Sequence, residues 1–254
     1  MVSNSENFNT IKFDKAIKGH CYAVGVGPGA PDLLTIRAAR IIETADVIIA
    51  PRSAIADSSL ALDTVKHLLG EHHTLVEHQY AMIRDEDVTI DRWKPIAEIM
   101  VDHCAKGKSV VQITIGDPLI YSTVAYVFPF LIEKLGENFV HVIPGISAFQ
   151  ISASKFGIPL TIQEDRLCIM PATDIEAVRA ALETSETLVL YKCAKQLPAL
   201  AKILSEKGLD MQCRVVCYAE QGDRETVFHN IHSAVASGNG YMATAIIFVN
   251  RKKW

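Results

Sequence analysis

The fold of this chain is set out in residues 21–50, which read CYAVGVGPGAPDLLTIRAARIIETADVIIA. Residues 21–26 are an unbroken apolar run, which predicts a buried β-strand, and glycines and prolines at 27–31 predict a tight turn after it. Asp32 is positioned to cap the next segment, in which Ala38 and Ile41 fall on one face of a helix. A second apolar run at 46–50 predicts another strand. Strand, helix and strand in this order favour an α/β fold with parallel pairing.

The same alternation continues outward from this stretch. Strands are predicted at 74–77 and 109–115, and the helical spacing of apolar residues at 89–106 predicts a helix that ends at Gly107. Strands that are apolar on both sides belong to a parallel sheet covered by helices on both faces. We therefore expect an N-terminal α/β domain over residues 19–116, preceded by a flexible tail at 1–18.

The second half of the chain keeps this alternation but ends differently. Strands are predicted at 139–143, 167–171, 187–193, 213–219 and 241–249, and helices at 122–135, 147–157, 175–184 and 196–207. Pro129 should kink the first of these helices or restart it. The connection between the last two strands lacks a strong helical period, which favours some antiparallel pairing and a mixed sheet. The sequence therefore predicts a second α/β domain over 117–254, with the boundary in the loop at 116–121.

The composition and charge of the chain argue against some classes of binding partner. The 254 residues are 49% hydrophobic and 21% charged, and the net charge of −4 argues against nucleic acid as the main partner. No apolar run reaches the roughly 18–20 residues that span a bilayer. The first 18 residues also lack the apolar segment of a secretory signal. We therefore expect a cytoplasmic protein that binds neither nucleic acid nor membrane.

Cysteine and histidine give no metal signature. The six cysteines form no CxxC pair and mostly lie in apolar runs, which favours reduced core thiols over ligands or disulfides. Four histidines fall within 67–78, but no cysteine or carboxylate has matching ligand spacing, so we interpret them as surface or loop residues. No protein-bound metal is expected.

Three loops rich in glycine or proline follow predicted strands, and they are the candidate ligand-binding elements. The first carries Gly25, Gly27 and Gly29, but Ala30 stands where the dinucleotide fingerprint needs its last glycine. Prolines in this loop also remove backbone N–H donors that a phosphate would use, so an uncharged or cationic ligand suits it better. A plain strand-to-helix turn explains this loop equally well.

The second and third loops point more strongly to a ligand. The second reads GDPLIYST at 116–123, and Pro118 restricts the backbone of Asp117, so that a stiff turn aims its carboxylate. The alternative is that Asp117 only caps the next helix. The third reads PGISAF at 144–149. Because ligands of open α/β sheets lie beyond the carboxyl ends of the strands, three such loops together predict one shared cleft.

These motifs resemble the three signatures of the tetrapyrrole (corrin/porphyrin) methyltransferase family: VGVGPGAPDLLT at 24–35, GDPLIYST at 116–123 and VIPGISAFQ at 142–150. The resemblance runs over about residues 20–250. Finer features are similar to one branch of the family, which methylates C(20) of precorrin-2 or cobalt-factor II. These features include IPL at 158–160, MPAT at 170–173 and LVLYK at 188–192.

The resemblance implies a homodimer of two-domain chains, with S-adenosylmethionine bound in a cleft between the domains. It also implies methylation of precorrin-2 or cobalt-factor II at C(20) in cobalamin biosynthesis, the alternative being another position on the corrin or sirohaem pathway. The residues alone leave two other classes open. One is an enzyme that modifies RNA or protein, against which the net charge counts in the RNA case, and the other is a binding module without catalysis.

By motif, the resemblance assigns the cofactor contacts in two sets. In the first set, Pro28 packs at the floor of the cleft, and the methionine end of the cofactor is held by the backbone of Ile115, Gly116 and Asp117 together with Ile120. The second set surrounds the ribose and adenine, and it consists of Ser147, Ala148, Tyr191, Lys192, Ala219 and Ala243. The chain departs from the common pattern at Ala30, Ala148 and Tyr191, where an acidic residue, serine and methionine respectively are frequent.

The chemistry expected from this resemblance needs few catalytic groups. Methyl transfer from a sulfonium is an in-line displacement, so the enzyme mainly supplies alignment and a dry site. We hypothesise that Asp117 anchors the cationic cofactor. Tyr121 is the predicted catalytic residue, which orients the macrocycle or relays the proton lost after methylation; a packed structural tyrosine is the alternative. Arg52, Arg84 and Lys192 are predicted to bind the substrate's carboxylates, with solvated surface cations as the alternative.

Overall fold

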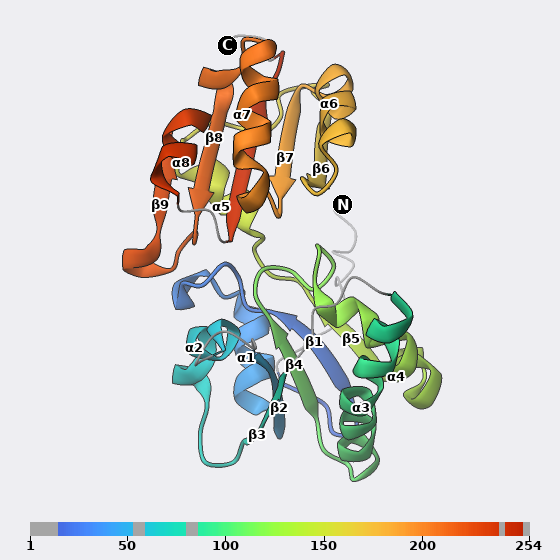
Figure 1. Cartoon of the computed structure of the whole chain (residues 1–254). Helices are drawn as coiled ribbons and strands as arrows, with labels where there is room; N and C mark the ends of the chain where they lie inside the picture. Colours follow the sequence, from blue (N-terminus) through green and yellow to red (C-terminus); the bar gives the residue numbers. More distant parts are fainter. Residues whose placement is uncertain (1–14, 53–58, 80–85, 239–241, 251–254) are drawn as a thin grey trace, which may run out of the picture. The chain divides into compact units, whose positions relative to one another are not determined.

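The chain divides into two compact units, Met1–Ile146 and Ser147–Trp254. The computed structural model describes residues 15–52, 59–79, 86–238 and 242–250, with side chains from residue 93 onward in the segment that begins at 86. The predicted boundary at 116–121 is therefore wrong, because the strand that follows it pairs into the first sheet. Each unit is an α/β layer structure with its own sheet (Figure 1).

The first unit contains a five-stranded sheet in the order β3-β2-β4-β1-β5. Every adjacent pair in it is parallel, which confirms the prediction for the N-terminal half. Strand β1 lies between β4 and β5, with Val24 opposite Ile113 on one side and Ile143 on the other. The strands are β1 (Cys21–Gly25), β2 (Val47–Arg52), β3 (Thr74–Gln79), β4 (Val110–Thr114) and β5 (Val140–Ile143).

Helices cover both faces of this sheet, as its unbroken apolar strands require. One core contains buried residues of α1 (Ile36–Thr44) and α2 (Leu60–Val65), and the other contains buried residues of α3 (Glu86–Ala105) and α4 (Phe128–Leu135). Successive residues of β4 pack in different cores. Val111 belongs to the core with α1 and α2, and Val110 belongs to the core with α3 and α4. Figure 1 shows the two helix pairs on opposite sides of the sheet.

Local signals in the first unit are partly confirmed. The N-cap of α1 is Thr35, whose side chain accepts from Ala38 N, so the prediction of Asp32 as the cap is wrong. Asp32 instead lies in the short 3-10 helix Pro31–Leu33, which Pro31 begins. Pro129 restarts the helix, as expected, since it occupies the first turn of α4, where its missing N–H costs no hydrogen bond.

The predicted tail at 1–18 lies mostly outside the described residues. Its last residues, 15–18, are described, and there the chain is held by the domain rather than free of it. Ala16 is buried in the core beside α1, and its N–H donates to Thr44 Oγ1 at 2.8 Å. This part of the tail prediction is wrong.

The second unit contains a five-stranded sheet in the order β6-β7-β10-β8-β9. Only β6 and β7 pair in parallel, and the other three pairs are antiparallel, so the predicted mixed sheet is confirmed. The strands are β6 (Leu167–Pro171), β7 (Thr187–Tyr191), β8 (Cys213–Cys217), β9 (Thr226–Phe228) and β10 (Ala243–Phe248). Because β10 runs against β7 and β8, its first residues share an edge with their last ones.

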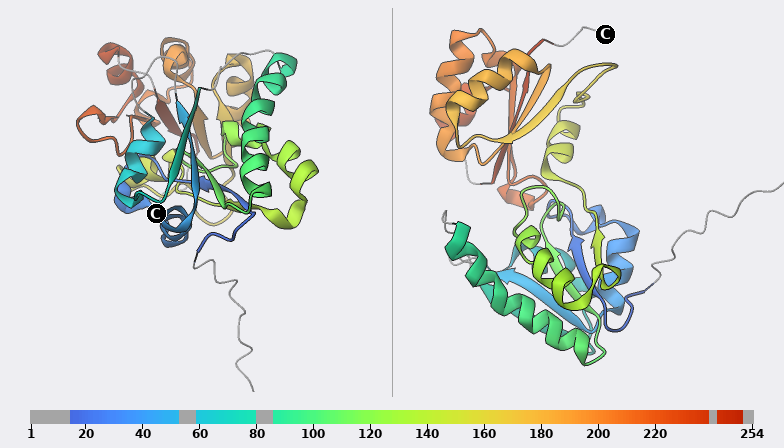
Figure 2. Two further views of the ribbon diagram at one scale, coloured as in Figure 1. Left: turned by 90° about the horizontal axis from the view of Figure 1, so that it is seen from below. Right: turned by 90° about the vertical axis from the view of Figure 1, so that its right-hand side faces the viewer.

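The helices of the second unit are divided unequally between the sheet faces. The larger core packs α6 (Ile175–Thr184), α7 (Leu197–Glu206) and α8 (Ile231–Ser237) on one face. The smaller core joins α5 (Ala148–Ser154) to β7 and β10 on the other face. Figure 2 (right) shows α5 and these helices on opposite sides of the sheet. Five of the six cysteines are buried, as expected of apolar side chains.

Short 3-10 helices join these elements, and they are Pro31–Leu33, Lys66–Leu68, Thr123–Tyr126, Glu137–Phe139, Ala194–Gln196, Asp210–Gln212 and Gly222–Arg224. None of the helices in the described part of the chain combines the length and apolar character that a membrane span requires.

Candidate functional site

The three predicted loops of the first unit lie together because β4, β1 and β5 are neighbours in a parallel sheet. Their carboxyl ends therefore meet at one edge of the sheet. The loops after β1 and β4 are joined by an isolated bridge between Gly27 and Gly116. Gly116 N donates to Gly27 O at 2.7 Å, and Gly27 N donates to Gly116 O at 3.3 Å.

Glycine at two positions allows these loops to touch through their backbones. A Cβ on Gly25 would lie 2.5 Å from Gly116 O, and a Cβ on Gly145 would lie 2.2 Å from the same oxygen. Both distances are shorter than any real Cβ contact, so a side chain at either position would force the loops apart. Gly25 and Gly145 thus serve loop-to-loop packing, and this role differs from the phosphate-binding role of glycines in a dinucleotide fingerprint.

Asp117 connects two of the loops through its carboxylate. Its Oδ1 accepts from Leu119 N at 2.8 Å, inside its own turn, and its Oδ2 accepts from Gly145 N at 3.0 Å, in the loop after β5. The alternative that Asp117 caps the following helix is wrong, because Ser122 caps it by accepting from Val124 N. Each carboxylate oxygen of Asp117 has a second lone pair in addition to the one it uses here.

The other predicted contacts of the first unit lie along the same edge. Pro28 is buried, while Ile115, Gly116 and Ile120 are half-buried. Tyr121 is 46% exposed, so it is not a packed core tyrosine, and its φ of 50° lies in the left-handed region. A non-glycine residue held there is strained, and such strain gathers at functional sites.

The three cations predicted to bind the substrate differ in where they lie in the chain and its fold. Arg52 ends β2, which neighbours β4, and it is exposed at the same carboxyl edge as the three loops. Arg84 lies outside the described residues. Lys192 belongs to the second unit, where it is exposed directly after β7.

The second unit has one edge with a concentration of strained residues. Four non-glycine residues at the ends of β7 and β8 and before β10 have positive φ angles between 52° and 59°. They are Lys192, Tyr218, Glu220 and Met242. Each carries a backbone cost that the surrounding structure must offset, which marks this edge as a candidate functional site.

The second set of predicted cofactor residues lies at this edge or on the adjoining helix α5. Ala219 and Ala243 are buried there, and Tyr191 ends β7. Ser147, also buried, begins α5 with a capping box to Gln150, and Ala148 follows it. Tyr191 Oη accepts from Phe149 N at 3.3 Å, so the structure brings the end of β7 and the start of α5 into contact.

An ionic cluster that the sequence does not predict lies at the other end of α5. Lys155 Nζ lies 2.5 Å from Glu220 Oε1 and 2.9 Å from Glu225 Oε1. The hydrogen bond to Glu220 contributes most to raising the pKa of Lys155, against the opposing effect of burial. No local pattern could have identified these partners, because they become neighbours only through the packing of α5 beside the β8–β9 connection.

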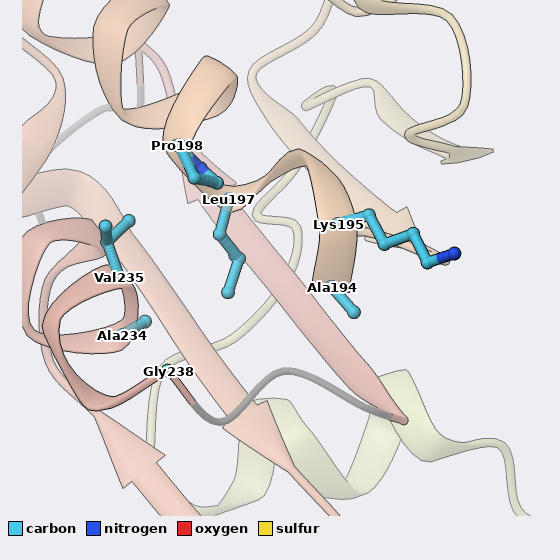
Figure 3. A pocket seen from close by; sticks show the side chains of 7 residues that line it. All are labelled: Ala194, Lys195, Leu197, Pro198, Ala234, Val235 and Gly238. Carbon is cyan, nitrogen blue, oxygen red and sulfur yellow. The ribbon is translucent and has the colours of Figure 1, made fainter.

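A small hollow of about 220 Å³ lies elsewhere on the second unit, between the start of α7 and α8 (Figure 3). Its lining consists of Ala194, Lys195, Leu197, Pro198, Ala234, Val235 and Gly238. Ligand pockets usually measure roughly 300–1,000 Å³, and none of these residues belongs to the predicted site. Among the described residues, no group of three or more histidine, cysteine or acidic side chains is placed to hold a metal ion.

The chain is thus an α/β protein of two units, and in each unit residues predicted to bind a ligand lie at one edge of the sheet. The chain belongs to the family of Tetrapyrrole (Corrin/Porphyrin) Methylases, whose sequence model matches residues 20–231. This match confirms the family that the three loop motifs predicted.

Named relatives agree with this membership over most of their length. The chain is 30% identical over 218 residues to a cobalt-precorrin-2 C(20)-methyltransferase of Salmonella typhimurium, covering 85% of this chain and 90% of that protein. It is also 30% identical over 234 residues to a precorrin-2 C(20)-methyltransferase of Sinorhizobium sp, covering 84% and 94% respectively.

A solved structure supports the fold. The chain is similar to a uroporphyrin-III C-methyl transferase from Thermus thermophilus complexed with S-adenyl homocysteine, with a TM-score of 0.62 and 22% identity. The match covers 90% of this chain and 91% of that one.

Proposed function

We propose that this protein transfers a methyl group from S-adenosylmethionine to C(20) of precorrin-2 or its cobalt complex, in cobalamin biosynthesis. The observation that carries the proposal is the near full-length similarity to two enzymes named for this reaction, one acting on the cobalt form and one on precorrin-2. Both relatives are 30% identical to the chain, so the proposed substrate class includes the metal-free and the cobalt-containing forms.

The residues of the first unit fit the charged end of the cofactor. S-adenosylmethionine carries a sulfonium and an ammonium group, which favour carboxylate and carbonyl oxygens nearby. The loop after β4 offers such oxygens in Asp117 and its backbone, while Pro28 and Pro31 leave the loop after β1 poor in N–H donors. This donor set suits a cation better than a phosphate.

The strained edge of the second unit fits the uncharged end. Ala219 and Ala243 have small side chains, so a planar base would meet no long side chain at these two positions. Tyr191 and the capped start of α5 complete the proposed set. Bound S-adenosylmethionine supplies the methyl group, and the role of these residues is to orient it and exclude water.

Tyr121 and three cations are the residues proposed to act on the substrate. The acceptor carbon must lose a proton after it is methylated, and the exposed hydroxyl-bearing ring of Tyr121 is next to the loop of Asp117. Arg52, at the same sheet edge, has the planar donor fork that matches a carboxylate of the macrocycle. Lys192 and Arg84 are the other proposed carboxylate contacts.

The test is to incubate the full chain with precorrin-2 or cobalt-factor II and S-adenosylmethionine carrying a ¹³C-labelled methyl group. Mass spectrometry should show the gain of one methyl, and carbon NMR should place it at C(20). A single methyl at another carbon would support the alternative position on the corrin or sirohaem pathway and overturn the C(20) assignment. Cofactor binding without turnover on any tetrapyrrole would favour a binding module.

We also propose that the protein acts as a cytoplasmic homodimer. The support is the family membership of the chain. Light scattering coupled to size-exclusion chromatography should give twice the mass of one chain, and a mass of one chain would overturn the dimer.

A further inference from the structure

Several side-chain contacts hold the β8–β9 connection at 218–225 in place. Glu225 Oε2 accepts from Glu220 N at 2.6 Å, and Gln221 Nε2 donates to Met242 Sδ at 3.7 Å. The guanidinium of Arg224 lies 4.2 Å from the centre of the Tyr218 ring. These contacts fix a short segment in which two residues, Tyr218 and Glu220, occupy the left-handed region.

Lys155 connects this segment to α5. Its ammonium group contacts both Glu220 and Glu225, and all three side chains are between 20% and 27% exposed. A part-buried ion pair with two carboxylates is worth more than an isolated surface pair, because solvent screens it less. Lys155 follows the last residue of α5, whereas Ser147 and Ala148 stand at its beginning.

Both ends of α5 are therefore tied to the strained edge of the second sheet. Tyr191 at the end of β7 accepts from Phe149 N at the start of the helix, and Lys155 pairs with the β8–β9 connection at its end. The helix and the connection each carry residues proposed to contact the ribose and adenine. The ionic contacts of Lys155 thus link the helix to the connection.

We propose that Lys155, with Glu220 and Glu225, is a positioning residue for the nucleoside part of S-adenosylmethionine. The three side chains hold Ala219 at the place where the cofactor meets it, and they do so without touching the reacting atoms. This inference rests on the proposed function, because it assumes that the strained edge binds this cofactor.

The experiment compares Lys155→Met with a matched control, Lys207→Met, in the full chain. The Lys207 side chain is also 25% exposed, and it pairs with Glu183. Lys207 follows the end of α7, near the edge of the sheet where β8 begins, and this edge is opposite the proposed subsite. Isothermal calorimetry measures the Kd of S-adenosylhomocysteine, and circular dichroism measures the melting temperature. Lys155→Arg tests whether a retained positive charge restores binding.

We expect Lys155→Met to raise the Kd about tenfold, and Lys155→Arg and Lys207→Met to stay within about threefold of the wild type. In turnover with saturating tetrapyrrole, Lys155→Met should raise the KM for S-adenosylmethionine and leave kcat within about twofold. Comparable losses of melting temperature in both methionine variants would show that the binding defect does not follow from stability alone. If Lys155→Met does not fold, Glu220→Gln provides the same comparison.

Two results would overturn the inference in distinguishable ways. If the wild-type chain binds S-adenosylhomocysteine and Lys155→Met binds it equally well, or Lys207→Met loses as much affinity, the positioning role fails and the proposed function stands. If the wild-type chain itself binds no S-adenosylhomocysteine, the proposed function fails and the inference fails with it.

Discussion

Asp117 and Gly145 are 28 positions apart in the chain, and a 3.0 Å hydrogen bond joins the carboxylate of one to the backbone N–H of the other. This bond fixes the loop after β4 against the loop after β5. The same carboxylate is the proposed anchor of the cofactor. Experiments must therefore separate its effect on the stability of the fold from its effect on cofactor affinity.

We expect Asp117→Ala to lower the free energy of unfolding by about 1–3 kcal/mol, because two backbone donors lose a charged acceptor. It should also weaken S-adenosylmethionine binding in calorimetry. Asp117→Asn keeps one acceptor oxygen and should restore part of the stability without restoring the charge. If Asp117→Ala bound the cofactor as tightly as the wild type, the anchoring role would be excluded.

We expect Gly145→Ala to destabilise the first unit by about 3 kcal/mol or more, since its Cβ would lie 2.2 Å from Gly116 O and backbone must move. Gly70→Ala is the matched control, because its nearest neighbour is the side chain of His72 at 3.2 Å. Chemical denaturation of both variants measures the difference. Equal stabilities would show that the loops tolerate separation.

Tyr121→Phe should slow formation of the deprotonated, methylated product in a single turnover by roughly 10²–10⁴-fold if the hydroxyl relays the proton, with little change in cofactor affinity. Rapid-quench measurement with preformed cofactor complex isolates this step from binding. An unchanged rate would exclude the proton relay and leave Tyr121 at most a role in orienting the macrocycle.

Stability should fall in acid because of Asp46. Burial alone would raise the pKa of Asp46, but hydrogen bonds from Lys18 and Ser109 outweigh it and lower the pKa from 3.8 to about 2. A depressed folded pKa means that the unfolded chain takes up the proton first, so this contribution is present above about pH 4 and is lost as the pH falls towards 2.

Asp46→Asn provides the comparison for this acid effect. Its free energy of unfolding should be lower than that of the wild type at pH 6, and the difference should shrink as the pH falls from 4 to 2 in urea denaturation. A difference that stays constant with pH would contradict the assignment of this acid sensitivity to Asp46.

The sequence was sufficient for the parts of the fold that depend on local periodicity. The unbroken apolar runs of β1 and β4 and the helical spacing of α3 correctly indicated a parallel sheet with two covered faces. Short elements such as α2, β9 and α8 were missed, since three to seven residues carry too little periodic signal. The domain boundary was misplaced because the pairing of β5 with β1 is a long-range contact that no local pattern records.

The residues of the candidate site could likewise be predicted only where a local sequence motif marks them. The glycine and proline loops could be read directly, and the structure brings those of the first unit together at one sheet edge. Lys155 could not be identified, because 65 positions separate it from Glu220 and neither belongs to a motif. Likewise, the strain at Tyr218 and Met242 concerns backbone angles that side-chain identity does not reveal.

The interlocked backbones of Gly25, Gly116 and Gly145 have a consequence for redesign of this enzyme class. A loop transplanted alone from a relative with a different regiochemistry would have to meet two unaltered neighbours at distances that admit no extra atom. The three turns therefore form one unit of the structure, and a redesign that exchanges one of them should exchange all three together.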